Sequence, residues 1–325
     1  MSEHTLGIDI AKDTFDVTLL GGPQRYQGHF TNDVEGFQKL SRWLKHRDVE
    51  SMHACMEATN RYWETLAYYL HESGYTVSVV NPKRIRDYGN AKMQRNKTDP
   101  ADAELIADYC LRQEPRPWTP PPSAYQELKL MVRRLVALKE DRQRERNRRA
   151  NDLPAVIRRS IDDHLDFLNH QIDKLEQQIN DYIAARPTMQ QDKELLVSIP
   201  GVGDIVAHTF MAEVPDVSLF PQAPQVAAYA GLTPGRKESG TSRHSPGHLV
   251  KWGDSYLRRV LYMPALSAHQ HNPIIASLRE RLRERGKSKM TVVVAVMRKL
   301  LHLCYGVLKT RKPFDPNHVA NASAT

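Results

Sequence analysis

Alternating apolar and polar positions predict a run of short β-strands at the start of the chain. Leu6, Ile8 and Ile10 are separated by small or polar residues, which is typical of a strand with one buried face. The same kind of pattern, bounded by turn residues, predicts four further strands. They are expected over residues 14–20, 26–30, 51–58 and 76–80.

Between these strands the apolar period changes to that of a helix. Asn32 is expected to cap the first helix, and Gly74 is expected to end the second, which is predicted over 62–72. A later helix is expected to open at Asp99. A three-stranded meander followed by crossover connections predicts an α/β domain with a mixed sheet flanked by helices.

A proline-rich stretch over 113–123 ends this domain, and two long helices are predicted beyond it, from Ser123 and after Pro154. In the second helix the apolar spacing alternates between four and three, as in a coiled-coil seam. An intramolecular hairpin with the preceding helix is the alternative, but the narrow stripe favours contact between two protomers, hence a homodimer. The stripe consists of Ile161, Leu165, Leu168, Ile172, Leu175, Ile179 and Tyr182.

The last third of the chain is predicted to be mainly helical. Residues 195–207 match the helix-hairpin-helix pattern, in which Gly201 and Gly203 let backbone N–H groups approach a phosphate closely. An ordinary tight turn between two helices is the alternative. Amphipathic helices are also expected over 254–267 and 290–308.

Charge changes this picture by indicating an anionic partner. The 325 residues carry a formal net charge of +8, and residues 123–159 alone hold 11 Lys and Arg against 5 Asp and Glu. Arginine predominates and suits bidentate phosphate contacts, although a solvated helix face offset by nearby acids is the alternative. The predicted nucleic-acid contacts on this helix are Arg133, Arg134, Arg142, Arg144, Arg146, Arg148 and Arg149.

The remaining composition predicts a cytoplasmic protein, and the DNA partner predicted below would make it nucleoid-associated. Cys55, Cys110 and Cys304 lie far apart in sequence, which argues against a disulfide framework or zinc site. Residues 1–4 have no signal-peptide pattern, and the longest uncharged apolar run, 292–297, is too short to cross a bilayer. No membrane contact is expected.

The most informative chemistry begins at the helix opened by Asp99. Residues three apart share a helix face, so Asp99 and Asp102 present two carboxylates together. Such a pair is stabilised by a cation, and the usual ion at an all-oxygen site is Mg²⁺ or Mn²⁺. Alternatively, Asp99 is a simple helix cap and Asp102 only favours the helix dipole.

Two carboxylates in predicted strands strengthen the metal interpretation. Asp and Glu are depleted in strands, yet Asp9 lies within the first strand and Glu57 near the end of the fourth. Solvent-facing positions or ion pairs would also explain them. Because sites in such sheets lie at the carboxyl ends of parallel strands, we expect these groups to converge there with the Asp99 helix. Four carboxylates suit two divalent ions about 3.5–4 Å apart, an arrangement that serves phosphoryl transfer.

Three motifs resemble the RuvC-like half of the DEDD insertion-sequence transposases, which include the Piv-type DNA invertases and the bridge-RNA-guided recombinases. They are the segments 7–12, 56–59 and 96–103. The resemblance implies an RNase H-like fold, and it makes Asp9, Glu57, Asp99 and Asp102 catalytic metal ligands. It also implies double-stranded donor and target DNA and a guide RNA as partners, with a tetramer assembled on DNA.

A long loop over 233–247 carries a candidate nucleophile among basic residues. Ser239, Ser242 and Ser245 are equally plausible from the residues alone, because Arg and Lys neighbours would stabilise a pentacovalent phosphate beside any of them. The family resemblance selects Ser239, which would form a 5′-phosphoserine link to DNA. Arg236 and Lys237 are predicted nucleic-acid contacts beside it.

Together these features predict three regions. Residues 1–122 would form an α/β RNase H-like (RuvC-like) catalytic domain, 123–188 a basic helix and coiled coil, and 189–325 a mainly α-helical transposase domain. The expected activity is RNA-guided DNA recombination. Two rivals remain, a hydrolytic RuvC-like junction nuclease in which water is the nucleophile, and a non-catalytic nucleic-acid scaffold.

Overall fold

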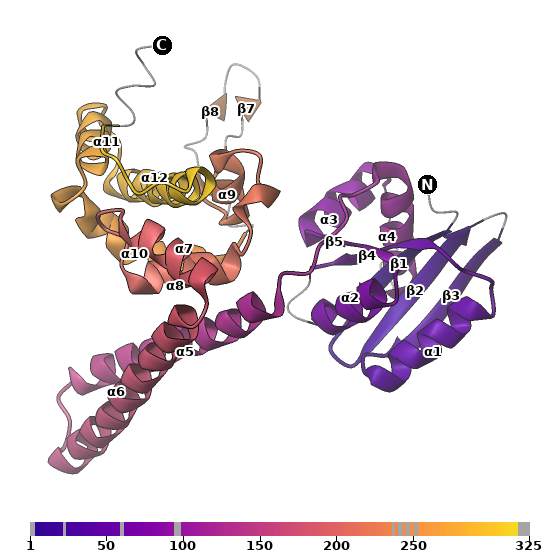
Figure 1. Cartoon of the computed structure of the whole chain (residues 1–325), viewed down its shortest axis with the longest axis horizontal. Coiled ribbons are helices and arrows are strands. Elements are labelled where there is room, and N and C mark those ends of the chain that lie inside the picture. Colours follow the sequence, from indigo (N-terminus) through magenta and orange to yellow (C-terminus); the bar gives the residue numbers. More distant parts are fainter. Residues whose placement is uncertain are drawn as a thin grey trace. The chain divides into compact units, whose positions relative to one another are not determined.

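The chain forms two compact units, Met1–Pro120 and Pro121–Thr325, in a computed structural model (Figure 1). Each unit has its own apolar core. For Asp99 and for the short strands between 234 and 249 only the backbone is described. The structure describes residues 4–21, 24–58, 62–93, 99–235, 238–239, 243–244, 248–249 and 253–317.

The first unit is built on a five-stranded mixed sheet. The strands are β1 (His4–Ile10), β2 (Thr14–Gly21), β3 (Gln24–Thr31), β4 (Met52–Glu57) and β5 (Thr76–Val80). Their order across the sheet is β3-β2-β1-β4-β5. The first three pair antiparallel, whereas β1, β4 and β5 run parallel. This meander with parallel crossovers fits the RNase H-like domain expected from the sequence.

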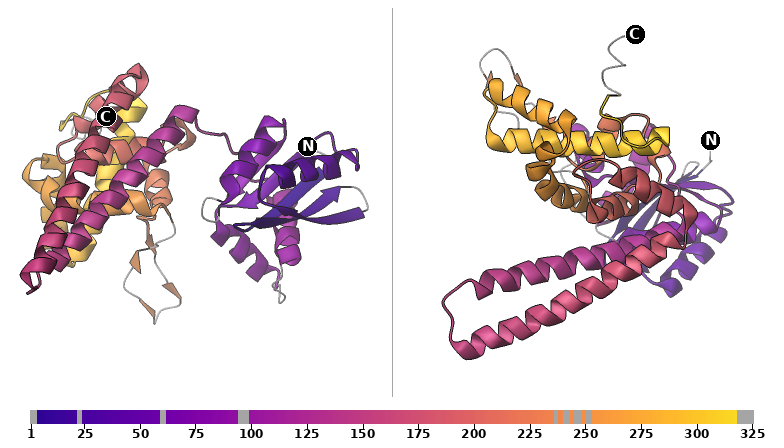
Figure 2. Two further views of the ribbon diagram at one scale, coloured as in Figure 1. Left: turned by 90° about the horizontal axis from the view of Figure 1, so that it is seen from below. Right: turned by 60° about the vertical axis from the view of Figure 1, so that its left-hand side comes forward.

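Helices cover both faces of this sheet (Figure 2). On one face, α1 (Val34–Lys45) and α2 (Tyr62–Glu72) bury their apolar stripes against Leu6, Ile8 and Ile10 of β1. On the other face, α4 (Asp99–Gln113) contacts β1, β2 and β4, and α3 (Pro82–Ala91) packs beside it. The second face is the one that matters for the candidate chemistry.

Two local predictions in this unit need correction. The cap of α1 is Asp33, whose carboxylate accepts the Gly36 N–H at 2.7 Å, whereas Asn32 donates to the carbonyl of Ala11. The sequence also gave no helix at α3, although Asn81 caps it and Pro82 follows at a position that suits proline.

The second unit begins with an antiparallel hairpin of α5 (Ser123–Arg149) and α6 (Ala155–Ala184) (Figure 2). The predicted seam of α6 packs on α5 of the same chain, so the expectation that it joins two protomers is replaced by the intramolecular alternative. The short connection at 150–154 favours this pairing because it brings α6 back along α5. The most deeply buried residues of α6 are Leu168, Ile172, Ile179 and Ile183.

The rest of this unit is a helical bundle packed around α12 (Lys289–Thr310), which contacts α7, α9, α10 and α11 (Figure 1). By length and hydropathy alone α12 is one helix that could cross a membrane, but half of that window is buried inside the unit. The other helices are α7 (Pro187–Val197), α8 (Asp204–Glu213), α9 (Ala223–Tyr229), α10 (Ser255–Ser267) and α11 (Pro273–Glu284), with short 3-10 turns at Val217–Leu219 and Ala268–Gln270.

The segment between α9 and α10, expected to be a structureless loop, contains two small antiparallel ladders. One pairs β6 (Pro234–Gly235) with β9 (His248–Leu249), and the other pairs β7 (Glu238–Ser239) with β8 (Arg243–His244). We call the chain from Leu232 to Gly253 the serine-bearing arm.

Candidate active site

The side chains of β1 alternate between the two helix layers. Because Leu6, Ile8 and Ile10 face α1 and α2, residues 7 and 9 face α4. Gly7 confirms this direction, since a Cβ atom there would lie 2.2 Å from the Ala103 carbonyl oxygen and 2.2 Å from the Ala107 nitrogen of α4. Asp9 is therefore on the α4 face of the sheet, where it is half-buried.

Glu57 lies on the same face of the neighbouring strand. Cys55 packs against Ile106 and Cys110 of α4, and Glu57, two residues later, shares its face. The parallel register pairs Gly7 with Cys55 and Ile8 with Met56, so Asp9 and Glu57 follow side by side at the ends of their strands. Neighbouring strands are about 4.8 Å apart, which brings the two carboxylates into one region.

The first turn of α4 points toward this end of the sheet. Ala103 lies over Gly7, whereas Cys110 Sγ lies 3.8 Å from the His53 carbonyl oxygen, level with Thr5 on β1. α4 therefore runs back along the strands from its first turn. Asp99 begins that turn, and Asp102 is half-buried within it.

No ready-made metal cluster is present among the residues that the structure describes with side chains, a set that lacks the Asp99 side chain. By backbone position, the structure thus places all four predicted carboxylate residues on one sheet face or in the helical turn near it, and it describes the side chains of three of them, Asp9, Glu57 and Asp102. What this arrangement offers chemically is a set of oxygen donors of like charge, which suits hard divalent cations.

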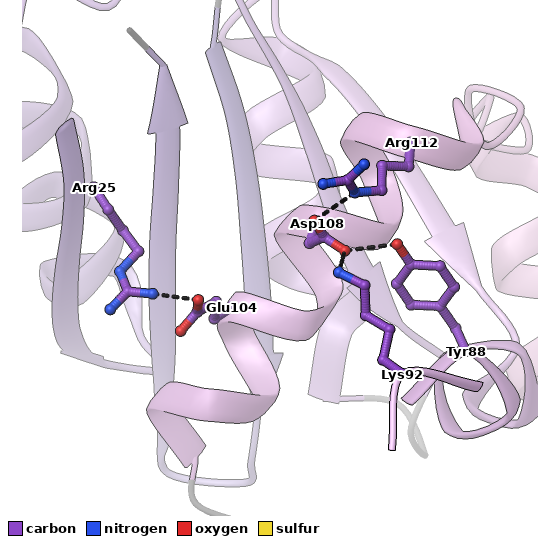
Figure 3. Close-up of polar contacts among 6 residues, drawn as sticks. All are labelled: Arg25, Tyr88, Lys92, Glu104, Asp108 and Arg112. Carbon is purple, nitrogen blue, oxygen red and sulfur yellow. Dashed lines mark hydrogen bonds and ion pairs between the residues drawn. The ribbon is translucent and has the colours of Figure 1, made fainter. Parts of the chain in front are cut away.

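Two other carboxylates of α4 tie the helix to neighbouring elements (Figure 3). Glu104 pairs with Arg25 of β3, and Asp108 pairs with Lys92, the residue that follows α3. Asp108 also accepts hydrogen bonds from Tyr88 at 2.6 Å and Arg112 at 2.8 Å.

Burial alone would raise the pKa of Asp108. The hydrogen bonds from Lys92, Tyr88 and Arg112 outweigh that effect and lower its pKa to about 2. The sequence shows the Asp108–Arg112 spacing of four residues, but it gives no sign of the contact with Lys92. These contacts hold the helix that carries Asp99 and Asp102.

A further acidic residue on this face was missed by sequence reasoning. Asp16 of β2 is directly opposite Asp9 in the antiparallel register, and its Oδ1 lies 3.1 Å from Nδ1 of His29 on β3. Opposed residues of an antiparallel pair share a face, so Asp16 extends the row of Asp9 and Glu57 across the sheet. The signal in the sequence was its place in an alternating strand, one position from the buried Phe15 and Val17.

The serine-bearing arm belongs to the second unit. β7 and β8 pair Ser239 with Arg243 and Glu238 with His244, so the backbone of Ser239 lies in a short hairpin. Arg236, Lys237, Ser242 and Ser245, which the sequence analysis also singled out, lie outside the described residues.

The basic helix α5 divides into buried and exposed arginines. Arg133, predicted as a nucleic-acid contact, instead makes a two-pronged ion pair with Glu213 of α8, with N–O distances of 2.8 and 3.1 Å. Its side chain is 19% exposed and that of Glu213 only 1%. A buried carboxylate needs such a partner, which is why this arginine faces inward.

Further along α5, Arg149 donates to Asp162 at 2.6 Å and Arg142 to Asn169 at 3.3 Å, so both tie α5 to α6. The outward-facing members of the predicted set are Arg134, Arg144, Arg146 and Arg148. Of these, Arg144 and Arg148 pair with acids one turn away on the same helix.

The two glycines of the predicted helix-hairpin-helix have different surroundings. Gly201 has a φ of +96°, and a Cβ there would lie 2.7 Å from Ala268 Cβ, so it serves the packing of the turn. Gly203 precedes α8, and a Cβ there would meet nothing within 4 Å. Asp204, the first residue of α8, pairs with Lys193 at 3.2 Å.

Two family models match the chain. One, a DEDD transposase model of the IS110 type, covers residues 6–156, and the other, described as "Transposase IS116/IS110/IS902 family", covers 193–280. The first therefore includes the sheet and α4, and the second includes the serine-bearing arm.

Individual relatives include one that matches over nearly the whole chain. The chain is 33% identical to the pilin gene-inverting protein of Moraxella bovis over 97% of its own length and 98% of the relative. It is 24% identical to the transposase of insertion sequence IS1328 from Yersinia enterocolitica, over 60% of this chain and 65% of that protein. A solved structure of T. thermophilus RuvC with a Holliday junction substrate matches at 12% identity, with a TM-score of 0.27 over 35% of this chain and 99% of that chain.

Proposed function

This chain belongs to the IS110 family of transposases, and from that premise we propose that it is an RNA-guided DNA recombinase that works through a phosphoserine link. Transposases cut and rejoin DNA strands, so the chain is a DNA-recombining enzyme. The finer parts of the proposal are the guide RNA, the metal site and the serine.

The observation that carries the proposal is the common face of Asp9 and Glu57, with the first turn of α4 above it. Carboxylates on adjacent strands repel each other unless a cation lies between them. Four of them, Asp9, Glu57, Asp99 and Asp102, have the donor chemistry for Mg²⁺ or Mn²⁺. Such ions, when bound, stabilise charge on the oxygens of a phosphate under attack.

Ser239 would supply the nucleophile. Its Oγ attacks the scissile phosphorus, and the hydroxyl proton leaves to solvent or a nearby base. The bond from phosphorus to the 3′-oxygen breaks, and that oxygen takes up a proton from solvent. The products are a 5′-phosphoserine and a free 3′-hydroxyl, so the phosphodiester energy is kept for rejoining. Arg236 and Lys237, next to it in sequence, would hold the phosphate.

Nucleic-acid binding is assigned to outward-facing basic residues and to one turn. We assign phosphate contacts to Arg134 and Arg146 on α5 and to the open backbone at Gly203. The partners would be double-stranded donor and target DNA and a guide RNA. The protein would act in the cytoplasm on the nucleoid, as a tetramer assembled on DNA.

The test uses a plasmid that carries this chain's own gene with its flanking DNA, because the recombination sites of a mobile element lie at its ends. Protein purified with its bound RNA is incubated with the plasmid and Mg²⁺ and stopped in detergent. We expect a covalent protein–DNA adduct whose phosphopeptide contains Ser239. Ribonuclease and chelator should each prevent it.

Matched variants separate the proposal from its rivals. Ser239→Ala should abolish the adduct while Ser242→Ala leaves it, and Asp9→Asn should abolish cleavage. Cleavage by Ser239→Ala at the wild-type rate would support hydrolysis instead. A protein that binds the plasmid without any metal-dependent cleavage would be a scaffold, and the proposed reaction would be wrong.

A further inference from the structure

The two ends of the serine-bearing arm are joined by one guanidinium group. Nη1 of Arg258 on α10 donates to the carbonyl oxygens of Ala230 at 2.9 Å, Gly253 at 2.9 Å and Asp254 at 3.2 Å. Ala230 lies just before the arm, and Gly253 and Asp254 lie at its return.

The backbone at the base of the arm is closely packed as well. The Asp254 N–H donates to the Tyr229 carbonyl oxygen at 2.8 Å. A Cβ atom at Gly253 would lie 2.3 Å from that oxygen and 2.4 Å from the Gly231 nitrogen, so only glycine fits. The two strands of chain therefore leave the bundle in contact with each other.

This base is attached to the buried part of the bundle. The Asp254 carboxylate caps α10 by accepting the Leu257 N–H at 2.8 Å, and Leu257 is 1% exposed. Tyr256, two residues after Asp254, has the Arg133 guanidinium over its ring. The guanidinium carbon lies 4.6 Å from the centre of the Tyr256 ring. Arg133 is held in turn by Glu213. The residues at the base of the arm are thus linked through α10 to α5 and α8.

We propose that Arg258 is a positioning residue that sets the exit geometry of the serine-bearing arm and thereby the reactivity of Ser239. The inference rests on the proposed function, since it presumes that Ser239 attacks DNA. An in-line attack needs the nucleophile held in a narrow range of positions. The described residues of the arm form two ladders of two residue pairs each, and the arm contacts the helical bundle at its base.

The experiment compares three variants on the plasmid described above. Arg258→Met removes all three hydrogen bonds, whereas Arg258→Lys keeps an ammonium with three N–H donors. Arg259→Met is the matched control, because it removes the same charge from the next residue, which pairs with Glu140 at the surface. For each, the rate of adduct formation and the plasmid dissociation constant are measured at one salt concentration.

We expect Arg258→Met to slow adduct formation about 10- to 100-fold, with plasmid affinity matching that of Arg259→Met. Arg258→Lys should recover a large part of the rate. Equal adduct rates in Arg258→Met and Arg259→Met would overturn the proposal. So would a loss of rate that only mirrors a loss of affinity or of thermal stability.

A measurement on the wild-type protein keeps the inference testable if Arg258→Met does not fold. Hydrogen exchange at the Asp254 amide should be as slow as at core amides of α10. Fast exchange there would show that the base is open and would overturn the proposal. The absence of an adduct in wild type, with slow exchange retained, would instead count against Ser239 as the nucleophile.

Discussion

The carboxylate face of the first unit and the serine-bearing arm of the second are built in different ways. Asp9 and Glu57 are placed by strand register, so their neighbourhood follows from the pairing of β1 with β4. Ser239 is in a two-residue ladder, and the groups that hold its arm, such as Arg258, come from a helix beyond it. A regular sheet therefore fixes one candidate site directly, and the other depends on contacts at its base.

The most damaging change to the first site should be Gly7→Ala. Its Cβ would lie 2.2 Å from two backbone atoms of α4, so the helix carrying Asp99 and Asp102 must move. We expect the rate of DNA cleavage to fall about 100-fold or more and the free energy of unfolding to fall by roughly 1–3 kcal/mol.

Gly203→Ala is the matched control in the second unit, because nothing lies within 4 Å of its Cβ position. Urea denaturation should show a stability within about 0.5 kcal/mol of wild type. If Gly7→Ala cleaves DNA at the wild-type rate, the helix does not have to sit on β1 for activity.

The next effect is a loss of stability when a buried side chain of the α5–α6 hairpin is truncated. Ile172, 1% exposed, packs against α5 of its own chain, whereas Phe167 is 57% exposed. Ile172→Ala should cost about 2–5 kcal/mol by urea denaturation, and Phe167→Ser less than about 0.5 kcal/mol. If the loss of unfolding free energy in Ile172→Ala changed with protein concentration, the α6 seam would be an interface between protomers.

Acid should weaken the second unit before the first. Burial, followed by the charge of Lys193, lowers the pKa of His208 to about 4, below its ordinary value of 6.5. The unfolded chain therefore takes up a proton first, and stability is lost as the pH falls from about 6.5 to 4. At about 1.4 kcal/mol per pKa unit, the loss is roughly 2–3 kcal/mol.

In the first unit, the lowered pKa of Asp108 keeps its ion pairs until the pH falls from about 4 toward 2. Peptide-resolved hydrogen exchange from pH 7 to 3 distinguishes the two units. His208→Leu should remove much of the loss between pH 6.5 and 4. Earlier opening of the sheet than of α8 would contradict this order.

The smallest effects are expected from single exposed arginines. Arg134→Ala and Arg146→Ala should each reduce the slope of log K against log salt concentration for plasmid binding by about 1. Arg149→Ala, whose side chain pairs with Asp162, should change the slope less. If all three variants had the same slope of log K against log salt concentration, Arg134 and Arg146 would not be phosphate contacts.

Features set by the local strand pattern were predicted from the sequence, whereas features set by contacts between distant elements were not. The five strands of the first unit, and its helices other than α3, were predicted because alternation, helical periodicity and turn residues are local signals. Asp9 and Glu57 were found because acids are unusual in strands. Asp16 was missed, since its place opposite Asp9 is a matter of register between strands.

In the second unit, the helices at 254–267 and 290–308 were predicted nearly in full, as α10 and α12 show. The helix that packs on the apolar stripe of α6 was not predicted. An apolar stripe indicates that a helix face will be buried, but it does not indicate which helix buries it. Nor does the sequence show that Arg133 faces inward to Glu213, 80 residues away. Such pairings depend on tertiary packing.

The central claim is that Asp9, Glu57, Asp99 and Asp102 surround the same divalent ions. Fe²⁺ can replace Mg²⁺ at oxygen sites and, with ascorbate and peroxide, cuts the backbone close to where it binds. We predict cuts near residues 9, 57 and 99–102 in the wild-type protein, all lost together in Asp9→Asn and competed by Mg²⁺. Cuts confined to one of these segments, or unchanged in Asp9→Asn, would contradict a shared metal site.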